Sequence, residues 1–449
     1  MLGLLVRLLR LFKKHTSHRL MTLTLAPWWL LILAVPVLLL GEFVQRRVGW
    51  FSRFSLPPPV VGGLAVSLLV LGLSLVGLLQ LNFVTKVDWA FWNWMVTPGL
   101  SWGTGGAKNL TLPMLVGFFT CVGLNATWRL VKGGSAGLVV FWGVSTVLAV
   151  FQNVVGVALA KLLGESPLLG VICGSLTLTG GHGTAMGFAQ TFVQAGFPAA
   201  ATVGAAAATF GVVCGSLIGG PLTTGLLNKH KLKPSAGAKG RFASHDAEGG
   251  DAGWLDLLRA LVTNGRVTLL HIAGLFVVIK LGAGLSHVLQ QAGLLFPSYM
   301  GALLVGLLVR NALDLAGLPW IDSRVVDIMG AVLLAVFLTI TMASLNLVEL
   351  AGTAGPMLVI LVTQILVVAL FARWVVFRCM GRDYEAAIMT AGFCGFALGS
   401  TSNAVANMDS LTKRFGPAPR AFLIVPTVGG LLVDLTNSFN ITWFLNILK

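Results

Sequence analysis

Residues 176–185 read Leu-Thr-Leu-Thr-Gly-Gly-His-Gly-Thr-Ala, and this stretch decides the fold because glycine and threonine interrupt an apolar chain. A continuous transmembrane helix has no use for three glycines in four residues, since each costs about 1 kcal/mol relative to alanine in a helix interior. Non-helical backbone at membrane depth is tolerated only where protein buries it or where it lines a wet cavity. The stretch therefore predicts a broken or re-entrant segment.

A second stretch of the same kind lies in the other half of the chain, where residues 395–401 read Gly-Phe-Ala-Leu-Gly-Ser-Thr. Two glycine-interrupted apolar segments at matching places in two halves are the best sequence indication of a transporter's binding site. We therefore expect both stretches to belong to one site.

The composition indicates a helical protein that crosses the membrane several times. Of the 449 residues, 56% are hydrophobic and only 10% are charged, whereas soluble domains carry about 25% charged residues. Apolar runs long enough for transmembrane helices recur along the whole chain, and the alternating pattern of a membrane β-barrel is absent. These features exclude an ordinary soluble fold.

The net charge of +15 comes from 30 basic against 15 acidic residues, and the basic residues lie mainly between apolar runs. This distribution sets membrane topology, so nucleic acid is not an expected partner. The five cysteines have no close pairing, which predicts small core residues rather than disulfides or transition-metal ligands. No HExxH, GxSxG or phosphate-loop motif is present, so we expect no enzyme, no cofactor and no direct use of ATP.

The apolar runs predict five spans in each half of the chain. They lie at about 27–44, 57–79, 110–127, 136–161 and 199–226 in the first half, and at 266–289, 298–316, 325–345, 354–377 and 420–445 in the second. The broken segments occupy about 167–192 and 385–408.

A polar linker separates the two halves. We expect a basic amphipathic tail at 1–26, a first repeat at 27–227, a cytoplasmic linker at 228–253 and a second repeat at 254–449. Leucines alternate with basic residues in 1–20, which is typical of a short helix on a membrane surface; a tail without function is the alternative. The tryptophan-rich loop at 82–109 favours packing at the headgroup level, with a lid as the alternative.

Five pairs of matching residues indicate that the halves are repeats. The pairs keep their order and lie 210 to 240 residues apart; they are Pro57 and Pro297, Asn125 and Asn346, Gln152 and Gln364, Thr184 and Thr401, and Gly219 and Gly429. Because each half has an odd number of spans, the second half runs in the opposite direction through the membrane.

Loop charges predict the orientation. A cytoplasmic linker places most loop arginines and lysines inside and both termini outside, although the basic residues at 7–19 disagree. The broken segments then enter from opposite sides and their tips meet near the midplane. Helix N-termini at that point suit an anionic group, while unwound carbonyls and hydroxyls suit sodium.

Asp434 is the leading ionisable candidate, because a charge inside a span is costly and marks function; a carboxylate held by nearby hydroxyls is the alternative. His182 is either functional or hydrogen-bonded to neighbouring backbone, and no second ligand at suitable spacing indicates a metal site. Structural roles are favoured for Glu42 and Asp327. Polar amides in the spans bridge helices or face a cavity; they are Asn125, Gln152, Asn153, Asn346 and Gln364.

Several motifs together resemble the sodium/glutamate symporters of bacteria. They extend over nearly all of residues 55–440 and comprise Pro57-Pro58-Pro59-Val60-Val61-Gly62-Gly63, Gly123-Leu124-Asn125, Ser175 through Thr184, Thr209-Phe210-Gly211, Gly219-Gly220-Pro221, Cys394-Gly395-Phe396, Ala404-Val405-Ala406-Asn407-Met408, Arg414-Phe415-Gly416-Pro417, and Val425-Pro426 with Asp434.

The resemblance implies an all-α polytopic membrane protein with two inverted repeats, each of five transmembrane helices plus a re-entrant hairpin. It implies an elevator-type secondary transporter, a homodimer in the inner membrane, that imports glutamate or a closely similar acidic substrate with sodium. By the family's pattern, the substrate would contact Gly181, His182, Gly183, Thr184, Ser400, Thr401 and Asn403, and sodium would contact Thr179, Gly399 and Asp434.

The second tip departs from the family pattern. The familiar sequence is Gly-Leu-Gly-Ala-Thr, whereas residues 397–401 read Ala-Leu-Gly-Ser-Thr, and Asn403 stands where threonine or a similar residue is expected. A change at a tip bears on substrate choice. A sodium-coupled carrier of another organic anion, such as a citrate-like dicarboxylate, is therefore the alternative, and a channel or membrane scaffold without coupled transport is a further one.

Overall fold

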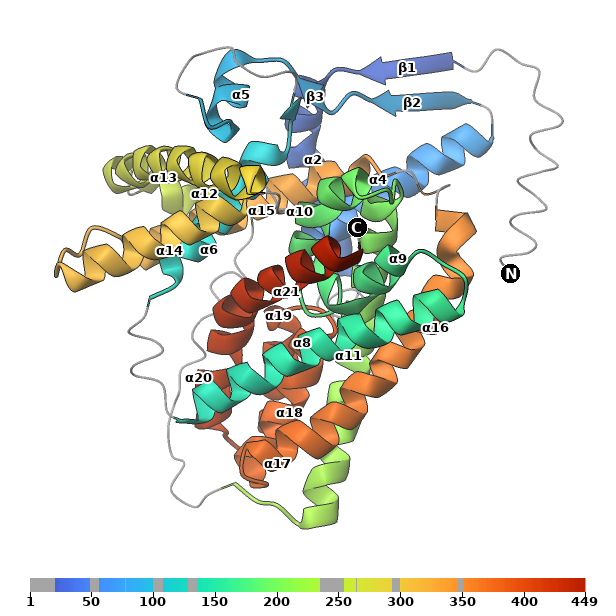
Figure 1. Cartoon of the computed structure of the whole chain (residues 1–449), viewed down its shortest axis with the longest axis vertical. Coiled ribbons are helices and arrows are strands. Elements are labelled where there is room, and N and C mark those ends of the chain that lie inside the picture. Colours follow the sequence, from blue (N-terminus) through green and yellow to red (C-terminus); the bar gives the residue numbers. More distant parts are fainter. Residues whose placement is uncertain are drawn as a thin grey trace.

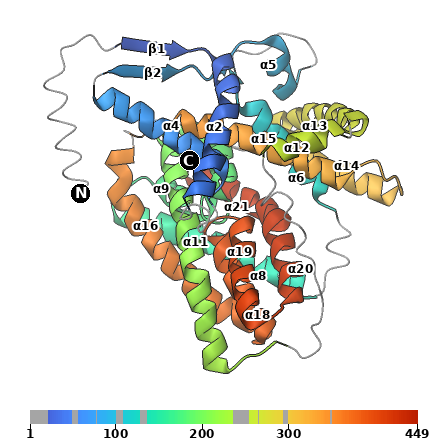
Figure 2. The same ribbon diagram turned by 180° about the vertical axis from the view of Figure 1, so that it is seen from behind.

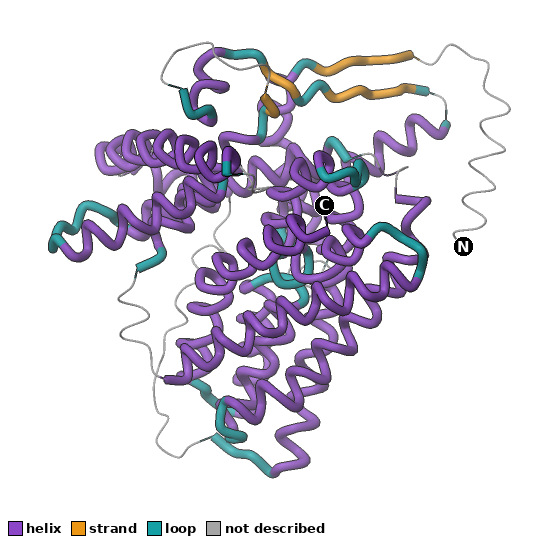
Figure 3. The backbone as a smooth tube through the Cα atoms, in the orientation of Figure 1, coloured by secondary structure: helices purple, strands orange, loops and turns teal. Residues whose placement is uncertain are grey.

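The computed structural model describes residues 21–48, 56–76, 78–99, 108–127, 136–234, 254–263, 265–292, 299–345, 347 and 350–448. Within these ranges the chain is mostly helical, as its composition predicts (Figures 1 and 3). The first half contains α2 (Pro27–Arg47), α4 (Pro58–Leu75), α5 (Ala90–Val96), α6 (Leu112–Asn125), α8 (Ala136–Leu162), α9 (Pro167–Val171), the π-helix η1 (Ile172–Leu176), α10 (Gly181–Gln194) and α11 (Ala200–His230).

The second half contains α12 (Trp254–Thr263), α13 (Gly265–Gln291), α14 (Met300–Leu315), α15 (Ser323–Ala343), α16 (Leu350–Phe371), the π-helix η3 (Ala372–Val376), α17 (Phe377–Cys379), α18 (Tyr384–Ala397), α19 (Thr401–Phe415), α20 (Pro419–Thr427), the π-helix η4 (Val428–Leu432) and α21 (Val433–Leu448). Helix α2 continues through Pro36 without a break.

Eight helical segments in the described ranges are long and apolar enough to cross a membrane, and they correspond to eight of the ten predicted spans. The other two predicted spans form shorter helices, because α6 has 14 residues and α14 has 16. At 1.5 Å per residue they extend only about 21 and 24 Å, less than the hydrocarbon thickness of about 30 Å. These two short helices pack against each other.

The helices form two groups, which Figures 1 and 2 show from opposite sides. In the first group, α2 packs on α4, α13 packs on α14, and α6 and α15 pack together in the middle. Helix α6 also packs on α14, and α15 packs on α4. The second group, which we call the hairpin group, contains α8, α11, α16, both broken segments, and the α20–α21 segment.

Glycines allow α8 and α9 of the hairpin group to approach closely. A Cβ atom at Gly156 would lie 2.1 Å from the carbonyl oxygen of Gly170, and a Cβ atom at Gly170 would meet the Gly156 backbone at 2.3 Å. Small residues permit such backbone contact between membrane helices. This contact holds the first broken segment against α8.

Short strands were not predicted and lie at one end of the first group. Strand β1 (Met21–Leu25) pairs in parallel with β2 (Leu79–Phe83), and β3 (Lys86–Val87) pairs antiparallel with β4 (Lys108–Asn109). The predicted tail at 1–26 therefore ends in a strand at residues 21–25, where Thr and Leu alternate as in a strand. Residues 1–20 lie outside the described residues.

The linker begins later than predicted. Helix α11 extends to His230, with Lys229 and His230 in its last turn, where basic side chains stabilise a helix C-terminus. Lys231 ends the helix in the left-handed conformation. Residues 235–253, most of the predicted linker, lie outside the described residues.

The tryptophan-rich loop contains α5, which contacts α13 through a hydrogen-bonded lysine and an aromatic pair. The Lys280 ammonium donates hydrogen bonds to the carbonyls of Trp94 and Thr97, both at 2.7 Å, and lies 4.4 Å from the Trp94 ring centroid. Phe91 also packs edge-on against Phe276 of α13. A cation at a helix C-terminus stabilises that end, so these contacts fit the packing role predicted for the loop rather than a lid.

Candidate functional site

Each broken segment is a hairpin whose two helical arms are joined by a short non-helical tip. The first hairpin runs from α9 through η1 to residues 177–180 and returns in α10; the second runs from α18 to residues 398–400 and returns in α19. Gly174 has φ −100° and ψ −135°, a conformation outside the helical region. The predicted breaks are therefore present, and Figure 3 shows short loops inside the helical body.

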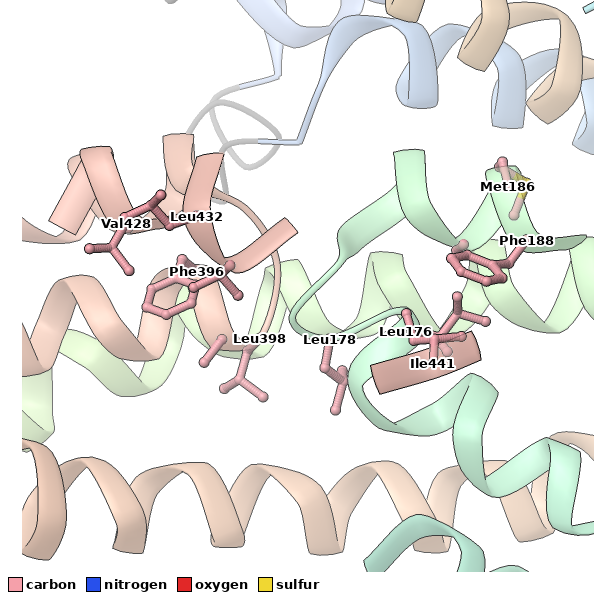
Figure 4. Packing of buried hydrophobic residues seen from close by; sticks show 14 of the residues in the cluster. Leu176, Leu178, Met186, Phe188, Phe396, Leu398, Val428, Leu432 and Ile441 are labelled. Carbon is pink, nitrogen blue, oxygen red and sulfur yellow. The ribbon is translucent and has the colours of Figure 1, made fainter. Parts of the chain in front are cut away.

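The two tips touch. Gly181 has φ +66°, which glycine adopts without a steric penalty, and a Cβ atom there would lie 2.6 Å from the carbonyl oxygen of Gly399. Leu178 and Leu398 lie near each other at the centre of Figure 4, and both approach Gly211 of α11. Sequence segments more than 200 residues apart thus form one structure at the centre of the hairpin group.

Gln152 of α8 binds both hairpins with one side chain. Its amide Nε2 donates to the carbonyl of Ala397 at 3.1 Å, and its Oε1 accepts from the hydroxyl of Thr179 at 2.6 Å. The backbone carbonyl of Gln152 accepts a hydrogen bond of 2.6 Å from Gln364 of α16. All three side chains are buried. The sequence left open whether the glutamines bridge helices or face a cavity, and these hydrogen bonds show bridging.

His182 is held by α11 and not by neighbouring backbone. Its Nε2 lies 2.9 Å from the hydroxyl oxygen of Thr209, and that hydroxyl donates to the carbonyl of Ala205 at 2.8 Å. A hydroxyl that donates elsewhere accepts from the imidazole, so the Nε2–H tautomer fits this geometry. The backbone-bonded alternative for His182 is therefore wrong.

A cavity of about 350 Å³ adjoins this histidine–threonine pair. It lies between α4, α11 and the residues after α15, and Leu64, Thr209, Phe210 and Leu345 contribute to its wall. Nearly all of this wall is apolar, whereas a polar ligand needs several polar partners once it leaves water. The cavity does not fit an acidic molecule.

Hydroxyls at the start of each return helix are available to a ligand. Thr184 and Thr401 are part of α10 and α19 and have no hydrogen-bonding partner within the described residues. Thr401 faces the π-helix η4 between α20 and α21, since its Oγ1 would lie 3.3 Å from a Cβ atom built at Gly429 of η4. Ser400 instead caps α19, because its hydroxyl accepts from the amide of Asn403 at 3.3 Å.

Asp434 lies in the first turn of α21, directly after the π-helix η4. Within the described residues its carboxylate makes neither a hydrogen bond nor an ion pair. The alternative of a carboxylate satisfied by nearby hydroxyls therefore lacks support. An unpaired carboxylate at membrane depth is costly, and a bound cation would offset that cost.

Two of the predicted substrate contacts have other surroundings. The side-chain amide of Asn403 donates to the carbonyl of Val212 at 2.9 Å and accepts from the hydroxyl of Ser216. Both the nitrogen and the oxygen of this amide are therefore hydrogen-bonded to α11. Gly183 faces the first helix group, where Leu334 and Phe118 are its nearest neighbours. Contact of either residue with substrate stays a prediction.

Other predicted polar residues stabilise helix contacts. Asn125 donates to Asp327 at 2.6 Å and thereby joins α6 to α15, and Glu42 pairs with Arg46 one turn along α2. These interactions agree with the structural roles expected for Glu42 and Asp327. Asn346 lies outside the described residues.

Sequence reasoning named Asn153 but missed the two asparagines of α21 that lie with it beside the first hairpin. Ser175 of η1 is contacted by Asn153 of α8 and by Asn437 and Asn440 of α21. The available signal was the spacing of Asn437 and Asn440, because polar residues three apart in an apolar span share one helix face.

The family model described as sodium/glutamate symporter matches residues 23–417. The chain belongs to the sodium/glutamate symporter family. A sodium/glutamate symporter of Haemophilus influenzae is 37% identical over 422 residues, covering 93% of this chain and 96% of the relative. One from Escherichia coli is 35% identical over 416 residues, covering 92% and 96%. No solved structure matches the chain.

The family match includes both hairpins and ends two residues before α20 begins. The relatives extend over nearly the whole chain, and they are symporters by name, which supports a transporter rather than an enzyme. The chain is therefore a multi-pass membrane protein of the sodium/glutamate symporter family, and its two hairpin tips touch.

Replacing Gln152 by alanine should loosen both tips at once, because each loses a buried hydrogen bond worth about 1 kcal/mol. Hydrogen–deuterium exchange should then speed up about fivefold at backbone amides of residues 176–184 and of residues 396–402. Gln190→Ala, an exposed glutamine on α10, is the matched control and should leave both tips unchanged. Faster exchange at one tip alone, or at neither, would show that Gln152 does not join them.

Proposed function

We propose that this protein is a secondary-active symporter that imports glutamate, or a closely similar acidic substrate, together with sodium across the inner membrane. The observation that carries the proposal is the contact of the two hairpin tips, in a chain of the sodium/glutamate symporter family whose Asp434 carboxylate has no hydrogen-bonding partner within the described residues. The relatives in Haemophilus influenzae and Escherichia coli carry both substrates in their names.

The geometry of the tips suits an anionic substrate. Helices α10 and α19 begin at the tips, at Gly181 and Thr401, and have 14 and 15 residues. Free amide groups and a positive dipole end attract negative charge at each N-terminus. We assign the substrate to this place, with contacts from Gly181, His182, Gly183, Thr184, Ser400, Thr401 and Asn403.

Sodium would bind next to the substrate. Thr179 supplies a hydroxyl oxygen, Gly399 supplies a carbonyl at the second tip, and Asp434 supplies the carboxylate. Hard cations prefer such oxygen ligands, and transporters bind sodium with unwound carbonyls near the midplane. The same carboxylate would also attract the ammonium group of an amino acid.

The helix pairings fit two inverted repeats. The contact of α2 with α4 corresponds to that of α13 with α14, and the contact of α6 with α14 corresponds to that of α15 with α4. An exchange of the halves thus maps each pair onto the other. We propose that the hairpin group moves against the first group as an elevator, and that two copies of the chain form a homodimer through the first group.

The ends of several helices support a cytoplasmic linker. The end of α11, the α17–α18 turn and the α19–α20 turn lie together, because the His230 ring is 5.4 Å from that of Phe377 and Gly416 approaches Pro234. These segments carry Arg378, Arg382, Lys413, Arg414 and Arg420. Such a concentration of basic residues is typical of the cytoplasmic side, and it supports the proposal that the linker is cytoplasmic and both termini are outside.

The relatives give no support to a citrate-like cargo. Glutamate therefore remains the proposed substrate.

Uptake of glutamate into proteoliposomes should require an inward sodium gradient. Coupling to sodium lets the carrier accumulate glutamate above its outside concentration, whereas a channel only equalises the two. Labelled glutamate uptake is measured with sodium or potassium outside, and unlabelled glutamate, aspartate and citrate serve as competitors. Equal uptake in potassium would refute coupling, and stronger competition by citrate than by glutamate would reassign the cargo.

Asp434→Asn should fold normally yet lose transport, because the neutral amide keeps the shape of the side chain and removes its charge. We expect uptake to fall by about tenfold or more, the scale on which ion sites respond to altered ligands. Asp409→Asn is the control, since Asp409 pairs with Lys413 on an exposed face of α19. Wild-type uptake by the Asp434 variant, at equal protein in the membrane, would remove this carboxylate from the mechanism.

A further inference from the structure

His182 lies at the start of the return helix of the first hairpin and uses only one of its two ring nitrogens. Its Nε2 lies 2.9 Å from the hydroxyl oxygen of Thr209, whereas its Nδ1 has no hydrogen-bonding partner within the described residues. Only 6% of the residue is exposed. A buried polar atom without a partner is costly, and native proteins rarely keep one without a reason. The free nitrogen is therefore a candidate contact for a ligand.

Thr209 determines which ring nitrogen carries the hydrogen. Its hydroxyl donates to the carbonyl of Ala205 at 2.8 Å, and a hydroxyl has only one hydrogen to donate. It can therefore only accept from His182, which places the hydrogen on Nε2. In a neutral imidazole the other nitrogen then keeps a lone pair and acts as an acceptor. Nδ1 thus accepts a hydrogen bond and cannot donate one.

The surroundings favour the neutral ring. No acidic side chain pairs with His182 in the part of the chain that the structure describes. A buried charge without a partner costs far more than a buried neutral group. The acceptor at Nδ1 is therefore the form of this residue that meets a ligand.

Free donors lie directly beside this acceptor. Helix α10 begins at Gly181, so the backbone amides of His182 and Gly183 come before the first hydrogen bond inside the helix. Within the described residues, neither amide donates to a group outside the helix. One end of α10 therefore presents an acceptor nitrogen and two donor amides within two consecutive residues.

This arrangement matches the head group of an α-amino acid. Such a head group has an ammonium, which only donates, and a carboxylate, which only accepts, on the same carbon atom. The carboxylate suits the free amides at the helix N-terminus, and the ammonium suits the lone pair of Nδ1. A diacid without an ammonium group has no hydrogen to donate to Nδ1. A site built to bind a substrate N–H rejects the analogue that lacks it, because the polar group of the site is then left unpaired.

We propose that His182 Nδ1 accepts a hydrogen bond from the ammonium group of the substrate, and that this contact selects amino acids over diacids of the same length. Thr209 acts through His182 and is a positioning residue, since it fixes the ring and its hydrogen. The proposal rests on the glutamate transport proposed above. It explains how the site would distinguish glutamate from glutarate, the same diacid without the amino group.

Competition against the uptake of labelled glutamate in sodium-loaded medium tests the proposal. The readout is the half-inhibiting concentration of unlabelled glutarate divided by that of unlabelled glutamate. In His182→Gln the amide reaches the position of Nε2 and keeps the contact with Thr209, but no acceptor remains at the position of Nδ1. The ratio should therefore fall about tenfold, as expected for the loss of a hydrogen bond to a charged group.

His182→Asn is the matched variant, because its amide oxygen can take the position of Nδ1. This variant should keep the ratio of the wild type to within about threefold. Equal losses of affinity for glutamate and glutarate in His182→Gln would overturn the proposal, because a structural role or a bond to a carboxylate weakens both alike. Absence of sodium-dependent glutamate uptake by the wild type would instead overturn the proposed symport itself.

A pair of Thr209 variants covers the case in which His182→Gln does not reach the membrane. Thr209→Val keeps the shape of the side chain and removes the hydroxyl, so the ratio should fall by about threefold or more. Thr209→Ser keeps the hydroxyl and should keep the ratio. An unchanged ratio in Thr209→Val would contradict the proposal, and it is the result expected if Asp434 alone attracts the ammonium group.

Discussion

The amide of Gln152 is the constraint on which the rest of the hairpin group depends. It donates to one hairpin at Ala397 and accepts from the other at Thr179, and it does so in a buried setting where no water competes. A hydrogen bond of this kind is strengthened by the low dielectric of its surroundings, and its loss leaves a costly unpaired group. The helix that carries Gln152 thus determines where two segments far apart in the chain come together.

Everything around this amide brings backbones close together. Gly156 and Gly170 let α8 and α9 touch, and Gly181 brings its backbone against Gly399. These close contacts bring helix N-termini and free carbonyls into the interior, where they can bind a ligand at a depth from which water is otherwise absent. They also leave buried polar atoms that have no hydrogen-bonding partner in the described part of the protein. Asp434 and Asn440 are the clearest of these, and both lie on α21.

Much of this arrangement was predictable, because glycine runs and apolar periodicity act locally. The breaks at 177–180 and 398–400 and eight of the ten spans follow from them. The strands at Met21–Leu25 and Leu79–Phe83 did not, since they depend on a pairing across more than 50 residues. The partner of His182 was also missed, because Thr209 reaches it only when α11 packs on the hairpin. Side-chain pairing across helices decides such contacts, and one sequence does not contain that information.

The central claim is that the cargo lies between the two tips. The most direct test is an electron cryomicroscopy structure of the protein in lipid nanodiscs with glutamate and sodium. Our account predicts density for glutamate within hydrogen-bonding distance of residues 181–184 and of residues 400–401 at once. Density for glutamate in the apolar cavity beside Phe210, or tips that lie apart in the substrate-bound protein, would contradict it.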